Sequence, residues 1–211
     1  MNKNQKALID IYLRKNFIKP PLSIFSKITG EKSSYNYDFE VVEKLKSEFK
    51  NFEIYKIKVK EYFLACTGLN GSYAHFALSN KVGQDDCICL QSEKSLGKLL
   101  SKVESLDDLS PNFLATVVFY SNLYVSHEMI LDITELEELL GKSPEEMELY
   151  KEQVAKVKDI IKPPFFISKN SSSEKELRFY TIYSKDSLLE ITAELNKDPK
   201  VVNKTLAIFS K

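Results

Sequence analysis

Residues 52–60, FEIYKIKVK, decide the fold class, because apolar and polar side chains alternate along them. A period of two is that of a β-strand, whose successive side chains point to opposite faces of a sheet. Three more stretches with the composition of strands follow, namely EYFLACT (61–67), SYAHFALS (72–79) and CICLQ (87–91). The turn-forming sequences GLNG (68–71) and NKVGQDD (80–86) separate them. The sequence therefore predicts an antiparallel β-meander over about 52–91.

Helical spacing of apolar residues predominates before the meander. In residues 4–15 the apolar side chains recur at intervals of three and four, and Pro20-Pro21 forbids continuation of that helix. A second helix is predicted to begin at Asp38, which is expected to be its N-cap. The expected buried stripes are Ala7, Leu8, Ile11 and Tyr12 in the first helix and Val41, Val42, Leu45 and Phe49 in the second.

Capping signals predict four helices after the meander. An N-cap residue followed by proline is a strong start signal, and it occurs twice. The segment that follows the first of these pairs, FLATVVF, is apolar on every side and is expected to be a buried central helix. The four predicted helices are 92–103, one that begins at Ser110-Pro111, 132–141, and one that begins at Ser143-Pro144 with the inner face Met147, Tyr150, Val154, Val157 and Ile161.

The C-terminal part is expected to combine strands with one helix. The predicted elements are the strands MILDI (129–133), FFISK (165–169), ELRFYTIYS (176–184) and KTLAIFS (204–210), with a helix from Asp186 to about Asn196. The fold class predicted for the whole chain is α+β: the meander packed with several helices, plus a C-terminal strand–helix–strand portion. One domain over 1–211 is expected, and 104–110 is the seam if there are two. The similar segments IKPPLSIFSK (18–27) and IKPPFFISKN (161–170) fit either a duplication or chance.

Composition argues against several classes of function. The chain has 30 basic and 30 acidic side chains, and only Arg14 and Arg178 are arginine. A nucleic-acid reader is therefore disfavoured, although Lys56, Lys58 and Lys60 alternate along one strand. We interpret those lysines as solvent-facing residues of an edge strand, where they discourage edge-to-edge aggregation. The most apolar stretch, 113–125, is too short to span a bilayer, and three cysteines do not make a disulfide scaffold, so a cytoplasmic protein is expected.

Cys87 and Cys89 raise the question of a metal site. Residues i and i+2 of a strand point to the same face, so the two sulfur atoms are expected to lie together. If Cys66 and His75 on the preceding strands shared that face, the four side chains would have the composition of a tetrahedral zinc site. The chain has no Cys-x₂₋₄-Cys knuckle, and buried cysteine commonly packs as a small apolar residue. Core packing is therefore the preferred interpretation, and metal is the alternative.

An enzyme would have to use the few nucleophiles and bases that the chain contains. The best catalytic pair is Cys66 with His75, and His127 is the other histidine. The segment GLNG lacks the third glycine of a dinucleotide fingerprint and the Gly-Lys-Ser/Thr of a P-loop. No cofactor is therefore expected.

Two regions have the composition of contact surfaces. Residues 134–152 concentrate glutamates, and the loop 29–38 places tyrosines among small polar residues. The expected function is a non-enzymatic cytoplasmic binding or regulatory protein, such as an inhibitor, an immunity-like protein or an adaptor, with another protein as its partner. An enzyme with a Cys/His site is the alternative, and nucleic-acid binding comes third. The residues expected to contact the partner are Tyr35, Tyr37, Glu137, Glu138, Glu145 and Glu146.

Overall fold

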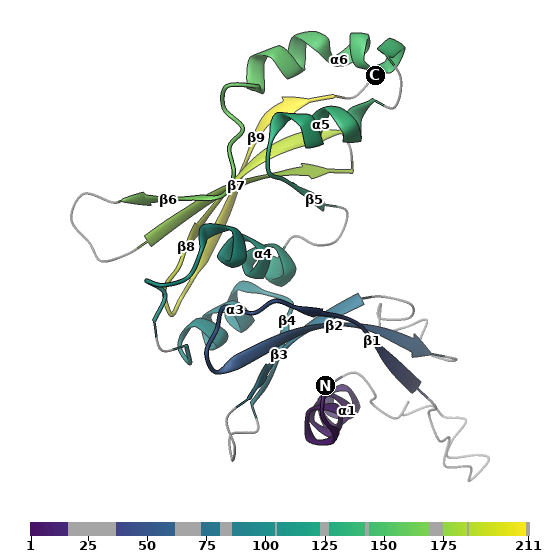
Figure 1. Cartoon of the computed structure of the whole chain (residues 1–211), viewed down its shortest axis with the longest axis vertical. Helices are drawn as coiled ribbons and strands as arrows, with labels where there is room; N and C mark the ends of the chain where they lie inside the picture. The colour runs from purple at the N-terminus through teal and green to yellow at the C-terminus, as the bar shows by residue number, and fades with distance from the viewer. Residues whose placement is uncertain are drawn as a thin grey trace, which may run out of the picture. The chain divides into compact units, whose positions relative to one another are not determined.

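The computed structural model describes residues 1–16, 37–61, 73–80, 86–103, 105–122, 127–141, 144–168, 175–184 and 186–209. The chain forms two compact units, Met1–Leu90 and Gln91–Lys211 (Figure 1). The α+β class is confirmed, since each unit contains an antiparallel sheet and at least one helix. The expectations of one domain over 1–211, or of a seam at 104–110, stay predictions.

The N-terminal unit contains a four-stranded sheet in the order β1-β2-β3-β4. Its strands are β1 (Tyr37–Leu45), β2 (Phe52–Glu61), β3 (Tyr73–Ser79) and β4 (Cys87–Leu90), and every neighbouring pair is antiparallel. The predicted meander is thus confirmed for its described strands. Most of the strand expected at EYFLACT and the first IKPP segment lie outside the described residues.

The helix predicted from Asp38 is wrong, because these residues form the edge strand β1. The register of β1 against β2 shifts between Val41 and Glu43, so Val42 is an extra residue on β1. Such a bulge interrupts the period of two and places two apolar residues side by side, which imitates helical spacing. Val41 and Val42 are exposed rather than buried, so they were not the inner stripe of a helix.

Helix α1 (Lys3–Asn16) packs on one face of this sheet. Its buried apolar side chains are Ile9 and Leu13, and Tyr12 is partly buried against the same core. The predicted stripe was wrong in part, since Ala7 and Ile11 are exposed and Leu8 is only partly buried. On the sheet, the core consists of Phe39, Tyr55, Ile57, Val59, Ala74, Phe76, Leu78 and Cys89.

The C-terminal unit has a five-stranded antiparallel sheet in the order β5-β7-β8-β9, with β6 also paired to β7. The strands are β5 (His127–Ile130), β6 (Phe165–Ser168), β7 (Lys175–Tyr183), β8 (Ser187–Glu194) and β9 (Lys200–Ile208). Its helices are α3 (Glu93–Leu100), α4 (Pro111–Asn122), α5 (Ile133–Leu140) and α6 (Pro144–Val157), which confirms the four predicted helices. Figure 1 shows α4 on the opposite side of this sheet from α5 and α6.

The helix predicted from Asp186 to Asn196 is also wrong, because these residues form β8. Ile191 and Ala193 are buried and the residues between and beside them are less so, as in a strand with one inward face. Leu188 and Leu189 are both buried, so the pattern of buried residues does not alternate at this end of β8. The register against β9 shifts here, but the extra residue is Leu206 on β9, so, unlike at β1, the bulge is not on the misassigned strand.

Helix α3 holds the turn between β8 and β9. The Glu93 side chain accepts a hydrogen bond from the backbone N–H of Val201, with 2.7 Å between Oε1 and N. A Cβ atom on Gly97 would lie 2.5 Å from the carbonyl oxygen of Lys197 and 2.8 Å from Cδ of Pro199. Only glycine fits here without a shift of backbone, so Gly97 sets how closely α3 approaches the turn.

Replacement of Gly97 by alanine tests this packing. We expect Gly97→Ala to lower the free energy of unfolding by about 1–3 kcal/mol, because the added methyl group overpacks the contact. Urea denaturation followed by circular dichroism measures the change. The matched control is Lys98→Ala on the exposed side of the same helix. Equal stability of the two variants would contradict the close packing of α3 at Gly97 on the turn between β8 and β9.

Candidate functional site

The register of β3 and β4 decides whether the cysteines and His75 can form one site. Phe76 lies opposite Cys89 and Leu78 lies opposite Cys87, so both cysteines project to the face that α1 covers. His75 lies opposite Leu90 and therefore projects to the other face of the sheet. Cys87 and Cys89 therefore do not share a face of the sheet with His75, so these three residues do not form one site.

Cys66 lies outside the described residues, so the complete four-residue set stays a prediction. Within the described part of the chain, no group of three or more His, Cys, Asp or Glu side chains is arranged to hold a metal ion. Cys87 is partly buried and Cys89 is buried.

Tyr12 of α1 closes over the two cysteines. Its ring meets Phe76 edge-to-face, with 5.4 Å between the ring centroids, and its hydroxyl shares a hydrogen bond with Cys89. Burial, together with the neighbouring thiols, raises the pKa of Tyr12 to about 12. Burial, and then the nearby Cys87, raises the pKa of the Cys89 thiol above its usual range. A buried neutral thiol is a poor nucleophile and a poor metal ligand, so Cys89 acts here as a packing residue.

His75 is buried, with 1% of its surface exposed. Burial, and then the charge of Lys56 directly opposite on β2, lowers the pKa of His75 to about 4. The imidazole is therefore neutral at pH 7.

The neutral state of His75 makes the stability of the fold depend on pH. Between pH 6.5 and 4 the imidazole of residue 75 binds a proton more readily in the unfolded chain than in the folded one. The free energy of unfolding therefore falls as the pH falls. We expect wild type to lose about 2–3 kcal/mol over this range relative to His75→Phe and His75→Gln, neither of which titrates. Urea denaturation at a series of pH values measures the difference. If all three proteins showed the same pH dependence, the neutral buried histidine would be excluded.

His127 begins β5 in the C-terminal unit and does not belong to the same unit as His75. Its Nδ1 lies 3.2 Å from Oγ1 of Thr181, and its ring centroid lies 4.9 Å from that of Tyr183. Burial lowers the pKa of His127 below its ordinary value. Thr181 is buried, so this hydrogen bond orients the imidazole rather than activating an accessible hydroxyl.

The sequence analysis placed the lysines of β2 on an edge strand. This prediction is wrong, because β1 and β3 flank β2. The register places Glu40 opposite Lys58 and Glu43 opposite Lys56. Cross-strand pairs of opposite charge stabilise a sheet modestly. Lys56 also lies over the ring of Tyr73, with 4.8 Å from Nζ to the centroid. This face is therefore an acidic strand beside a basic one, which weakens the hypothesis of a nucleic-acid track.

A polar network at the start of α1 was missed from the sequence. The side chain of Gln5 donates to Glu53 with 2.9 Å between Nε2 and Oε2, and Lys44 donates to the other oxygen at 2.6 Å. The Tyr55 hydroxyl donates to Glu53 as well, at 2.6 Å. Asn2 and Gln5 form a capping box, each side-chain oxygen accepting the other's backbone N–H. The spacing Asn-x-x-Gln was the signal that could have revealed the cap.

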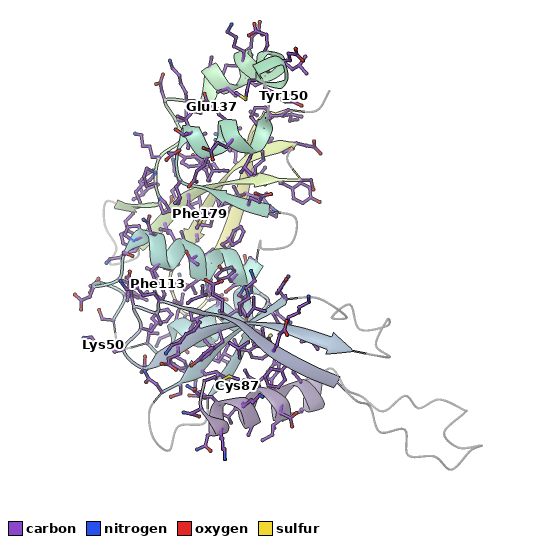
Figure 2. All side chains as sticks on the ribbon, turned by 45° about the vertical axis from the view of Figure 1, so that its right-hand side comes forward. Lys50, Cys87, Phe113, Glu137, Tyr150 and Phe179 are labelled. Carbon is purple, nitrogen blue, oxygen red and sulfur yellow. The ribbon has the colours of Figure 1, made fainter. Side chains whose placement is uncertain are left out.

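Exposed glutamates lie on the outer surfaces of α5 and α6. Glu137 and Glu138 are exposed on α5 and Glu145 on α6 (Figure 2 labels Glu137). Segment 132–157 holds eight acidic and three basic residues. The side chains of Glu146 and Tyr37 are not described, and Tyr35 lies outside the described residues.

An exposed leucine lies among these glutamates. Leu149 has 58% of its surface exposed, and its neighbours on α6 are Glu145, four residues before it, and Glu152, three residues after it. Both glutamates are exposed, and so is Glu148, which precedes Leu149 in the sequence. The opposite face of the helix is fixed to the core: the ring of Tyr150 meets Phe209 edge-to-face at 5.8 Å, and Val154 and Val157 are buried. Helix α6, packed on the core through its inner face, thus presents Leu149 within an acidic surface.

Comparison with known proteins gives no relative for the chain. No protein-family model matches it, and no curated protein or solved structure shows a significant match. Among the described residues, no helix is long and apolar enough to cross a membrane.

Proposed function

We propose that the chain is a non-enzymatic binding protein that acts through protein–protein contact at the outer surfaces of α5 and α6. The observation that carries this proposal is Leu149, exposed on a helix whose inner face packs on the core, with the exposed Glu145 and Glu152 beside it and Glu148 next in sequence. An apolar centre with a charged rim is the usual anatomy of a protein contact. A cytoplasmic regulatory protein, such as an inhibitor, an immunity-like protein or an adaptor, fits this arrangement.

The chemistry of the surface indicates what the partner presents. Glutamates at this density attract a basic surface and accelerate encounter, whereas Leu149 needs an apolar side chain or shallow pocket opposite it. Glu148 already pairs with Lys151 at 3.1 Å, but both side chains are about 70% exposed, so this ion pair is easily exchanged for one with a partner. The expected partner surface is therefore basic at its rim and apolar at its centre.

Capture of partners from the source cell tests the proposal. The bait proteins are wild type, Leu149→Ser, the triple variant Glu145→Gln/Glu148→Gln/Glu152→Gln, and a control with three exposed glutamates of the N-terminal unit changed, Glu40→Gln/Glu43→Gln/Glu48→Gln. We expect wild type and the control to retain a stoichiometric protein partner. Both α6 variants should retain at least about tenfold less, because each removes part of the desolvated contact.

The salt dependence separates specific contact from chance retention. Capture by wild type should weaken as ionic strength rises, since the glutamates are exposed and screened. A partner retained equally by all four baits would place the contact elsewhere on the chain. Failure of the wild-type bait to retain any stoichiometric protein under any condition would contradict the proposed function itself.

A further inference from the structure

The outer face of α1 in the N-terminal unit is apolar at its centre and basic at both ends. Ile11 has 59% of its surface exposed, and Ala7, one turn earlier on the same face, is exposed as well. Lys3 lies four residues before Ala7, Lys15 lies four residues after Ile11, and both lysines are exposed. The buried residues of α1 lie on the opposite side of the helix, so the packing of α1 on its sheet directs this face outward.

This composition is complementary to that of the acidic surface on α6. There Leu149 is the exposed apolar centre, Glu145 lies four residues before it and Glu152 lies three residues after it. On each helix, therefore, a charged residue lies roughly 5–6 Å along the axis to either side of the apolar centre. The sign of the charge is reversed between the two helices, so each offers the rim and the centre that the other can bind.

The total charges of the two helices have the same opposite signs. Helix α1 holds four basic side chains and one acidic side chain, whereas α6 holds four acidic and two basic ones. The whole chain has 30 basic and 30 acidic side chains, so two copies carry no net charge that would keep them apart. Attraction between α1 of one copy and α6 of another is therefore not opposed by repulsion between the complete chains.

We propose that α6 of one copy of the chain binds the outer face of α1 of a second copy. Leu149 lies against Ile11 in this contact, and the glutamates that flank Leu149 lie against the lysines at the two ends of α1. The inference rests on the proposed function, because it assigns a partner to the surface of α6 described above. The two surfaces differ, so the contact is heterologous. A single helix-on-helix contact is smaller than a standard protein interface, so we expect a Kd of about 100 µM.

Sedimentation of the purified full chain at a series of concentrations tests the inference. We expect wild type to change from monomer to larger species between roughly 10 µM and 1 mM. Added salt should weaken this association, because the lysines and glutamates are exposed and screened. Ile11→Ser changes an exposed side chain and should raise the Kd about tenfold, because it removes the apolar centre that α1 contributes.

Reversal of charge identifies the two surfaces. Lys3→Glu/Lys15→Glu leaves α1 and α6 both acidic, and Glu145→Lys/Glu152→Lys leaves both basic, so each variant alone should stay monomeric over the same concentrations. Mixed in equal amounts, the two variants should associate about as tightly as wild type, because each then presents the helix that the other can bind. This recovery also shows that both variants are folded.

Lys46→Glu/Lys50→Glu is the matched control, since it reverses two exposed lysines of the N-terminal unit outside α1 and should associate as wild type does. The inference is overturned if wild type stays monomeric up to roughly 1 mM. It is equally overturned if the mixed charge-reversed variants associate no better than either does alone. Both results leave the proposed function standing when the wild-type bait retains a different protein through α6, so the two failures are distinguishable.

Discussion

The carboxylate of Glu53 ties α1 to the N-terminal sheet, and the packing of that unit depends on this connection. Hydrogen bonds from Lys44, then Tyr55, and a weaker one from Gln5 lower the pKa of Glu53 to about 2. Gln5 takes part in this network and in the capping box at the start of the helix, so the first turn of α1 is fixed to β2. With its start fixed, α1 places Ile9, Leu13 and Tyr12 over the sheet and seals Cys89 beneath them.

The elements that could be predicted correctly are those whose sequence signals involve only neighbouring residues. Ser92 and Asp132 accept hydrogen bonds from the helices they were expected to cap, and both prolines begin helices, because capping involves only neighbouring residues. Residues 38–45 were misassigned where a bulge breaks the alternation of β1, and residues 187–194 were misassigned because the adjacent Leu188 and Leu189 are both buried. A bulge depends on the partner strand, so the pattern of one strand alone could not reveal it.

In the candidate site, too, local spacing could be predicted but the pairing between strands could not. The spacing of Cys87 and Cys89 predicted a shared face, and the structure places both toward the core under α1. Whether His75 would join them depended on the register between β3 and β4, and a slip of one residue would reverse the answer. The partners of Glu53 lie on α1, β1 and β2, so their convergence needed the tertiary structure. The two units also divide the charge: residues 1–90 carry 14 basic and 10 acidic side chains, and residues 91–211 carry 16 and 20.

Helix α1, held by Glu53, makes Cys89 a core residue. Alkylation of Cys89 in the folded protein, quantified by peptide mass spectrometry, tests this most directly. In wild type the thiol should react only after α1 opens, far more slowly than in urea. Glu53→Gln should accelerate labelling about tenfold, because it weakens a charged hydrogen-bond network, whereas the exposed Glu40→Gln should not. Labelling of native wild type at the rate of the unfolded chain, or no effect of Glu53→Gln, would contradict the account.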